Sequence, residues 1–356
     1  MKFRLAPSKK INPSDQYLAR MMMNVMLQPL KHPDQSVLVS VFTPCELMQE
    51  AGLYPYNVES FSCYLTASSA ERAFLQSAED SGLSETLCSY HKTFIGAAEK
   101  GLLPKPKCIV YTNLACDANL LTFQRLAEFF HVPVFSIDVP SGQTSENVAY
   151  VAAQLRALRG FLEQTTGHQI DEGRLVQRVK RGYKTLQQFD AFQSARADRF
   201  IPSDLVSPLY SGMTNNILLG TEEEALYTEK LLQDVKKAPP KKGKHIYWMH
   251  TIPFWSDAVK DALLLNDDVQ IVGCELSQAT DISRHLEDPY EEMAMRLIYH
   301  ALNGPISRRI NAGIRHAKQA GADGVVWFNH WGCKHTLGGS RIAKKRFEDA
   351  GLPTLI

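Results

Sequence analysis

Three cysteines of this sequence stand where the pattern predicts that a strand runs through a short loop into a helix. Cys88 lies in ETLCSYHK, Cys116 in YTNLACDANL and Cys333 in GVVWFNHWGCKHTLGGSRIAKKRF. A helix N-terminus carries partial positive charge and free N–H groups, which stabilise a thiolate and bond to cluster sulfur. In open α/β sheets, ligands bind at the strand ends. The three thiolates therefore suit a metal ion or an iron–sulfur cluster better than a disulfide.

The placement of these cysteines is more informative than their spacing. They are far apart in the sequence and form no CxxC pair. Buried, unconnected thiols are the alternative explanation, because cysteine often packs as a small apolar residue. The other four cysteines are predicted to be structural. Cys108 and Cys274 fall in predicted strands, and Cys63 falls in a polar loop. Cys45 lies in the first turn of a predicted helix and is an alternative extra ligand.

The elements that must position these residues alternate between apolar strands and helices. Strands are predicted at 36–42, 54–58, 108–114, 134–138, 245–250, 269–274 and 324–328, with another beginning in the final PTLI. Helices are predicted at 15–30, 44–51, 84–100, 120–130, 257–265, 289–303, 307–319 and 340–350, and through 145–197 with breaks at Gly167 and Gly182. This alternation is typical of doubly wound parallel sheets.

The fold class is therefore predicted to be α/β, with two Rossmann-like (flavodoxin-like) parallel-sheet domains and an added helical region. The expected division is an N-terminal α/β domain at 1–144, a helical region at 145–235 and a C-terminal α/β domain at 236–356. Between the last two, the lysine-rich stretch 236–244 is open to two interpretations, an anion site or a solvated linker.

Composition limits the classes of function and partner. The 356 residues suffice for two domains with sizeable cores. Lys and Arg total 39 against 38 Asp and Glu, a net charge of +1, so no general attraction to nucleic acid or anionic membranes is expected. No apolar run approaches the ~20 residues of a membrane span, and the N-terminus resembles no signal peptide. Seven cysteines, an odd number, then favour a reducing, cytoplasmic location.

Candidate catalytic side chains follow the first two predicted strands. Thr43 and Glu46 come just after the first strand and Glu59 just after the second. A carboxylate at this edge can act as a general base or orient a substrate hydroxyl. Two of the three also have a structural alternative, because Thr43 before Pro44 suits a helix N-cap and Glu46 in a helix first turn complements the helix dipole.

The loop around Cys333 is rich in polar and aromatic side chains. His330, Trp331, Lys334 and His335 are candidates for hydrogen bonds to cluster sulfur or for shaping a substrate pocket, and bonds to the backbone are the alternative. Gly338 and Gly339 precede a helix, where a phosphate or CoA group can bind, or where close packing requires glycine. No Walker A or GxGxxG motif occurs, so this chain is not expected to hydrolyse nucleotides.

Three long segments resemble the 2-hydroxyacyl-CoA dehydratase and benzoyl-CoA reductase subunit family. They are FTPCELMQEAGLYP, CSYHKTFIGAAEKGLLPKPKCIVYTNLACDANLLTFQRLAE and DGVVWFNHWGCKHTLGGSRIAKKRFEDAGLPTLI, which occur in family order over almost the whole chain. Members of this family usually continue beyond a strand like that in PTLI with an Asp-rich loop and a closing helix. This sequence ends at Ile356, so the C-terminal domain is expected to lack that segment.

The resemblance implies a specific cofactor and reaction. It implies a [4Fe–4S] cluster on three cysteines that match Cys88, Cys116 and Cys333, with one iron open to substrate. It implies a second family subunit in a homo- or heterodimer, an ATP-dependent activator that injects one electron, and radical (ketyl) dehydration of a 2-hydroxyacyl-CoA. A related low-potential reductase with a larger cluster, or a non-catalytic partner subunit with a structural metal, are the alternatives.

Overall fold

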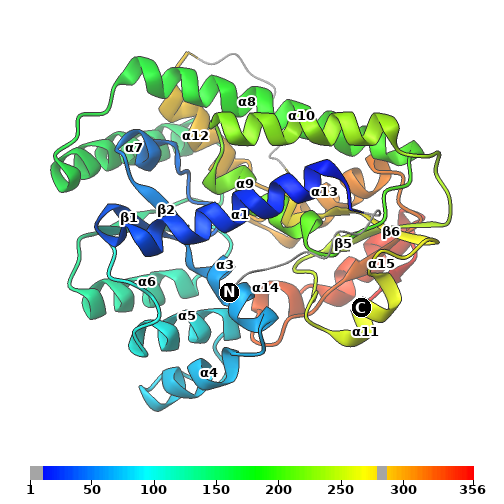
Figure 1. The fold of residues 1–356 in the computed structure, drawn as a ribbon, viewed down its shortest axis with the longest axis horizontal. Helices are drawn as coiled ribbons and strands as arrows, with labels where there is room; N and C mark the ends of the chain where they lie inside the picture. Colours follow the sequence, from blue (N-terminus) through cyan, green and yellow to red (C-terminus); the bar gives the residue numbers. More distant parts are fainter. Residues whose placement is uncertain (1–10, 279–286) are drawn as a thin grey trace.

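The computed structural model describes residues 11–278 and 287–356 and contains two four-stranded parallel sheets (Figure 1). Their strand orders are β2-β1-β3-β4 and β6-β5-β7-β8. The strands are β1 (Ser36–Val39), β2 (Tyr54–Asn57), β3 (Cys108–Thr112), β4 (Val134–Ile137), β5 (Lys244–Met249), β6 (Val269–Cys274), β7 (Gly324–Trp327) and β8 (Thr354–Leu355). The predicted α/β class with two parallel sheets is confirmed.

The first sheet forms because its central strands are apolar along their whole length. All residues of β1 (SVLV) and β3 (CIVYT) are buried. Such continuous apolar runs are typical of parallel strands that helices cover on both faces. The parallel register pairs Val37 with Cys108 and Val39 with Val110, so β1 and β3 end at the same edge. Residues that follow the two strands are thereby brought together.

The second sheet repeats this arrangement around β5 and β7. Tyr247 pairs with Val325 and Met249 with Trp327, which aligns the ends of the two central strands. The PTLI segment forms the short edge strand β8 against β7, as the sequence predicts. One register irregularity lies between Ile246 and Tyr247, where β5 pairs with β6.

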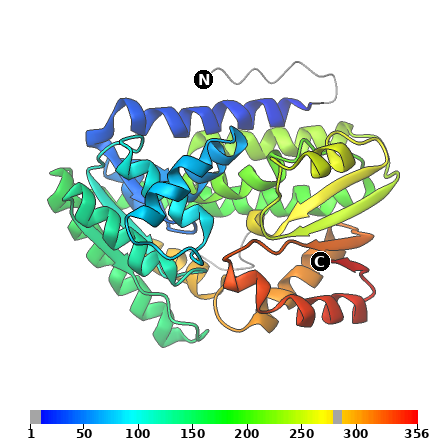
Figure 2. The same ribbon diagram turned by 90° about the horizontal axis from the view of Figure 1, so that it is seen from below.

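Helices cover the sheets and fill the space between them (Figure 1). They are α1 (Pro13–Lys31), α2 (Glu46–Glu50), α3 (Val58–Ala67), α4 (Glu71–Asp80), α5 (Ser89–Glu99), α6 (Ala118–Phe130), α7 (Ser145–Thr166), α8 (Glu172–Ala195), α9 (Ser207–Ile217), α10 (Glu222–Lys237), α11 (Asp257–Leu263), α12 (Pro289–Ile298), α13 (Ile306–Gln319), α14 (Lys334–Leu337) and α15 (Ser340–Asp349). Helix α1 lies along one side of the molecule and packs on β1 and β2 as well as on α9 and α10 (Figure 2). Within the described residues, no helix has the length and apolar character that a membrane crossing requires.

Three local predictions are wrong, each for a packing reason. Thr43 does not cap a helix, because its hydroxyl bonds to Ser40 Oγ (2.9 Å) and α2 begins only after Cys45. Helix α8 continues through Gly182, where a Cβ would meet the Leu219 side chain at 3.0 Å, so this glycine serves close packing rather than a break. Cys63 is buried in α3 rather than lying in a polar loop.

Candidate functional site

Each of the four central strands ends in a loop that contains a residue of left-handed conformation. Phe42 follows β1, Ala115 follows β3, His250 follows β5 and Gly332 follows β7, with φ angles of 67°, 69°, 75° and 81°. A non-glycine residue in this conformation costs roughly 1–2 kcal/mol. Backbone strain of this kind persists where the surrounding structure holds it, typically at functional sites. A functional site is therefore expected at these strand ends.

Two of the three predicted cysteines lie at these strand ends, because Cys116 follows β3 and Cys333 follows β7. The prediction that Cys88 also follows a strand is wrong, because helices α3 and α4 lie between β2 and the start of α5. Cys88 is the N-cap residue of α5, Cys333 is that of α14, and Cys116 lies in the loop before α6. A Cβ built on Gly332 would stand 3.0 Å from the Cα atom of Cys88, so the loops of the two halves are in direct contact there. All three cysteines are partly exposed, whereas the other four in the chain are buried. Exposure thus separates the predicted ligands from the structural cysteines.

The thiols are close enough to affect one another electrostatically. Burial raises the pKa of Cys88 to about 11, and Cys333 adds to the increase. Burial likewise raises the pKa of Cys116 to about 12, with contributions from both other thiols. Backbone N–H groups at the helix starts, those of Tyr90 and Ala118, oppose the rise. These two thiols are therefore neutral near pH 7, and a positively charged group is needed to draw out their thiolates.

A histidine hydrogen-bonds to Cys333. The Nδ1 atom of His250 accepts the backbone N–H of Thr251 at 2.6 Å. Burial, followed by the charge of Arg309, lowers the pKa of His250 well below its usual range, so the ring is neutral. Its proton therefore sits on Nε2, which lies 3.5 Å from Cys333 Sγ. His250 is thus an N–H donor to this sulfur.

A buried ion pair fixes the segments on both sides of this contact. Arg309 donates to both carboxylate oxygens of Glu275, each at 2.6 Å, and the two side chains are almost fully buried. Glu275 also accepts the backbone N–H of His250 at 3.0 Å, and Arg309 donates to the carbonyl oxygen of His335 at 2.6 Å. The guanidinium lies over the Trp327 ring, 4.6 Å from its centroid. One bidentate pair therefore ties β6, α13 and the loops that carry His250 and Cys333.

A second histidine contacts Cys116. Thr122 donates its hydroxyl to the Ala118 carbonyl oxygen (2.8 Å), which leaves its oxygen to accept from Nδ1 of His91 (2.9 Å). Burial lowers the pKa of His91 to about 4, so the ring is neutral and its bare Nε2 faces Cys116 Sγ at 3.6 Å. The Cys116 thiol therefore donates to His91.

His330 lies beside Cys88 and carries an unpaired nitrogen. Its Nε2 is 3.2 Å from the hydroxyl of Ser89, and its ring lies parallel to that of His250 at 6.3 Å. Its Nδ1 atom is buried without a hydrogen-bond partner among residues 11–278 and 287–356. A buried polar atom of this kind usually pairs with a group that binds at the site. His330 thus connects the loop of Cys333 with the start of α5, which follows Cys88.

Of the three predicted catalytic residues, Glu59 lies beside the cysteines. It occupies the first turn of α3 and accepts the Val41 N–H at 3.2 Å and the Asn57 side-chain amide at 3.1 Å. Burial raises its pKa from 4.5 to about 7, and its charge in turn adds to the raised pKa of Cys88 and of Cys116. This carboxyl can exchange a proton near neutral pH.

The other two predicted catalytic residues are held away from the thiols. The Thr43 hydroxyl is buried against Ser40. Glu46 forms a buried ion pair with Arg296 from α12. Nothing in these contacts brings either residue to the cysteines.

The predicted substrate-binding residues lie on the outer side of the Cys333 loop. Trp331 is 79% exposed, and Lys334, His335 and Gly338 are also exposed. Gly339 is buried, and a Cβ there would meet the Ile306 side chain at 2.8 Å, so close packing accounts for this glycine. The structure therefore leaves Trp331 and Gly338 accessible beside Cys333.

The arrangement suits a cluster better than one ion. Within residues 11–278 and 287–356, no three His, Cys, Asp or Glu side chains are arranged to hold a single metal ion. In a cubane cluster each cysteine binds a different iron, so the sulfurs stand farther apart than ligands of one ion. Such a group fits the three partly exposed thiols and the backbone N–H donors at two of them. It could also pair with the unpaired His330 nitrogen.

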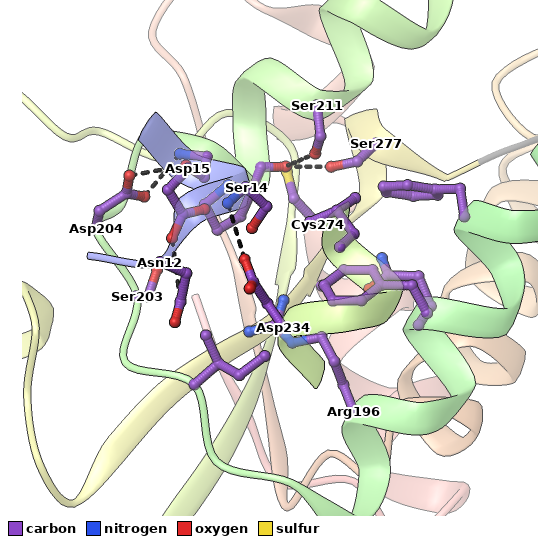
Figure 3. Close-up of a pocket in the computed structure, with 18 of the residues that line it drawn as sticks. Asn12, Ser14, Asp15, Arg196, Ser203, Asp204, Ser211, Asp234, Cys274 and Ser277 are labelled. Atoms are coloured by element: carbon purple, nitrogen blue, oxygen red, sulfur yellow. Dashed lines mark hydrogen bonds between the residues drawn. The ribbon is translucent and has the colours of Figure 1, made fainter. Parts of the chain in front are cut away.

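A separate polar cavity lies under the start of α1 and contains none of the three cysteines (Figure 3). It measures about 40 Å³ and is lined by Asp15, Asp204 and Arg196 among others. Burial raises the pKa of Asp15 to about 7, and the nearby Asp204 adds to the rise. Asp234 accepts the backbone N–H of Ser14 at 2.8 Å. This cluster attaches α1 to α9 and α10, which is a structural role.

Comparison with known families accounts for almost the whole chain. The family model described as 2-hydroxyglutaryl-CoA dehydratase, D-component, matches residues 40–356. The chain belongs to this family. No curated protein matches it. The match includes every strand except β1, which ends at Val39, and all three cysteines of the candidate site, so the chain is a component of the 2-hydroxyacyl-CoA dehydratase type.

Sequence reasoning missed four residues of this dehydratase-family site. His250 and Glu275 directly follow β5 and β6, so the strand-end criterion that selected the cysteines also applies to them. His91 lies in the first turn of α5, three positions after Cys88. Arg309 lies within α13, where an arginine normally faces solvent, and no local signal marks it as buried.

Proposed function

We propose that this chain is the iron–sulfur component of a 2-hydroxyacyl-CoA dehydratase, with a [4Fe–4S] cluster on Cys88, Cys116 and Cys333. The observation that carries the proposal is that three partly exposed cysteines, from both halves of a chain that matches the family, lie close enough to raise one another's pKa. When bound, the cluster would supply a low-potential electron and a Lewis-acidic iron open to a substrate oxygen.

The surrounding residues would orient the thiolates and disperse their charge. Nε2 of His250 donates to the sulfur of Cys333, and backbone N–H groups at the starts of α5 and α6 point at the sulfurs of Cys88 and Cys116. Such donors hold ligands in place and tune the potential of a cluster. The Glu275–Arg309 pair holds His250 and the Cys333 loop in fixed positions relative to each other.

Glu59 would serve as the proton acceptor. A general base works best when its pKa lies near the working pH, and burial places the pKa of Glu59 at about 7. The proton to be removed would be one on the acyl carbon chain of the substrate. Glu46 is neutralised by Arg296 and Thr43 is engaged with Ser40, so neither is assigned this role.

The rest of the proposal depends on family membership. One-electron activation by an ATP-dependent activator, pairing with a second family subunit and a cytoplasmic location are expected with this chemistry. Trp331 and Gly338, exposed beside Cys333, are proposed to contact the acyl-CoA.

Iron and acid-labile sulfide, measured per chain on anaerobically purified protein, test the cluster. We expect about four irons and a cubane EPR signal after strong reduction. Cys88→Ala, Cys116→Ala and Cys333→Ala should each lose the iron. Cys108→Ala is the matched control, because Cys108 is buried in β3 and should affect stability alone. Equal iron in all four variants would refute the ligand assignment, zinc would favour a structural metal, and about eight irons would favour a reductase.

Turnover is the second test. An assay with activator, ATP and a series of 2-hydroxyacyl-CoAs should show dehydration in the wild type and none in Glu59→Gln with normal iron content. Dehydration by Glu59→Gln at the wild-type rate would exclude Glu59 as the base.

A further inference from the structure

A second cavity lies where the first sheet, the helical region and α12 meet. It measures about 50 Å³, and its lining includes Phe42, Glu46, Asn215, Arg296 and His300. These come from the loop after β1 and the start of α2, from α9, and from the end of α12. The loop after β1 separates this cavity from Glu59, because Val41 N–H points to Glu59 while Phe42 and Glu46 line the cavity. None of the three cysteines lines it.

Two buried side chains in this cavity carry unpaired hydrogen-bonding atoms. Asn215 is only 6% exposed, yet neither its Oδ1 nor its Nδ2 has a partner in the part of the chain that the structure describes. Glu46 is 1% exposed. One of its carboxylate oxygens accepts from Arg296, and the other, Oε2, has no partner among the same residues. Leaving such atoms unpaired is costly for a folded protein. Their presence in one cavity indicates a group that binds there.

The charges in the cavity cancel. Glu46 is paired with Arg296, so together they contribute no net charge. Burial lowers the pKa of His300 to about 4, so that ring is neutral near pH 7. An anion would meet the unpaired Glu46 oxygen, and a cation would find no second carboxylate among the lining residues that the structure describes. The favoured occupant is uncharged.

The unpaired atoms define what this occupant must offer. Asn215 Oδ1 and Glu46 Oε2 each need a donor, and Asn215 Nδ2 needs an acceptor. A primary amide supplies two N–H donors and one carbonyl acceptor, whereas a hydroxyl supplies one donor and a carboxylate supplies none. The cavity also has room for more than one water, because a single water needs only about 10–15 Å³ of such space. We propose that this cavity binds a terminal primary carboxamide group.

Such a group has two possible sources. It could belong to a free small amide, or it could end the acyl chain of the substrate. The second source rests on the proposed dehydratase function, whereas the site itself does not. Binding can be measured on the purified full-length chain whether or not it holds iron, so the two proposals can fail separately.

Acetamide is the probe, with acetate as its charged analogue of the same shape. We expect saturation-transfer NMR to detect acetamide with a Kd on the order of 10 mM, and a soaked crystal to show it between Asn215 and Glu46. Acetate should bind at least about tenfold more weakly. Binding of acetate as tight as acetamide would overturn the assignment of an uncharged group, and the absence of acetamide binding would show that the cavity holds water only.

Asn215→Leu removes the donor and acceptor at similar volume. We expect it to weaken acetamide binding at least about tenfold while leaving the Tm unchanged or higher, because it also removes unpaired buried atoms. Asn311→Leu is the matched control, since Asn311 is exposed on α13, and it should bind acetamide normally. Wild-type affinity in a folded Asn215→Leu variant would overturn the proposal.

Competition identifies the source. If a 2-hydroxyacyl-CoA ending in a carboxamide displaces acetamide, the cavity receives the end of the acyl chain. If the two bind together, it serves a separate small amide.

Discussion

The Glu275–Arg309 pair allows a quantitative prediction about the candidate site. Removing one member, as in Glu275→Leu or Arg309→Met, leaves the other charge buried without compensation, because the side chains are only 6% and 2% exposed. Breaking a buried pair in this way costs about 3–5 kcal/mol of unfolding free energy. If the two residues acted independently, the double variant would lose about 6–10 kcal/mol.

The double variant should lose much less than that sum. It contains no buried charge, but the N–H of His250 and the carbonyl of His335 lose their partners. Leaving each of these unpaired costs about 1–3 kcal/mol. We therefore expect a total loss of about 2–6 kcal/mol and, from the middle of the two ranges, a coupling energy of about 4 kcal/mol between the two positions.

Urea unfolding followed by tryptophan fluorescence is the assay, because Trp327 lies directly under the Arg309 guanidinium. The matched control is the exposed pair Lys345–Asp349 on α15, whose side chains are 75% and 56% exposed. An exposed pair at this helical spacing should couple by at most about 0.5 kcal/mol. Additive losses at Glu275 and Arg309 would contradict the view that a single buried pair holds the site together.

Two further predictions concern Glu59 and a helix contact. The pKa of Glu59 is raised from 4.5 to about 7, so the folded protein holds this proton more tightly and its stability falls as pH rises between these values. Glu59→Gln should therefore be more stable than wild type at pH 8, by about 3 kcal/mol at most. The measurement is the urea midpoint of unfolding of both proteins at about pH 4.5 and about pH 8. The same difference between variant and wild type at both pH values would contradict this prediction. Gly96→Ala should destabilise the protein by about 1–3 kcal/mol or more, because the new Cβ would overlap the Phe74 carbonyl oxygen of α4. The control is Gly160→Ala in α7, where the new Cβ has free space, so this variant should be neutral or stabilising. Equal melting temperatures for the two variants would refute this packing argument.

Much of the fold could be predicted because its signals are local. The buried strands in SVLV and CIVYT read as continuous apolar runs, and their alternation with helices specifies a parallel sheet. The errors arise where a tertiary contact overrides a local preference. Gly182 continues a helix because Leu219 packs against it, and Thr43 bonds to Ser40 instead of capping α2.

The candidate site could be predicted only in part. Cys116 and Cys333 were found because the position of a residue relative to a strand end is visible in the sequence, whereas only the helix that begins after Cys88 was read correctly there. Glu59 was found in the same way, although it begins a helix rather than ending a strand. Arg309 could not be found, because a mid-helix arginine acquires a role only when Glu275, from a distant strand end, is buried against it.

The sequence alone determined the fold class, the family and which cysteines stand next to helix starts, since these depend on periodicity and on residues close together in the chain. Tertiary structure decided which polar groups meet. It paired His250 with Cys333, and it left the side-chain amide of Asn215 and one carboxylate oxygen of Glu46 without partners among the described residues of one cavity. Those outcomes depend on burial, because desolvation raises the cost of every unpaired charge and hydrogen bond, and burial is established only when the two sheets and the helices between them pack together.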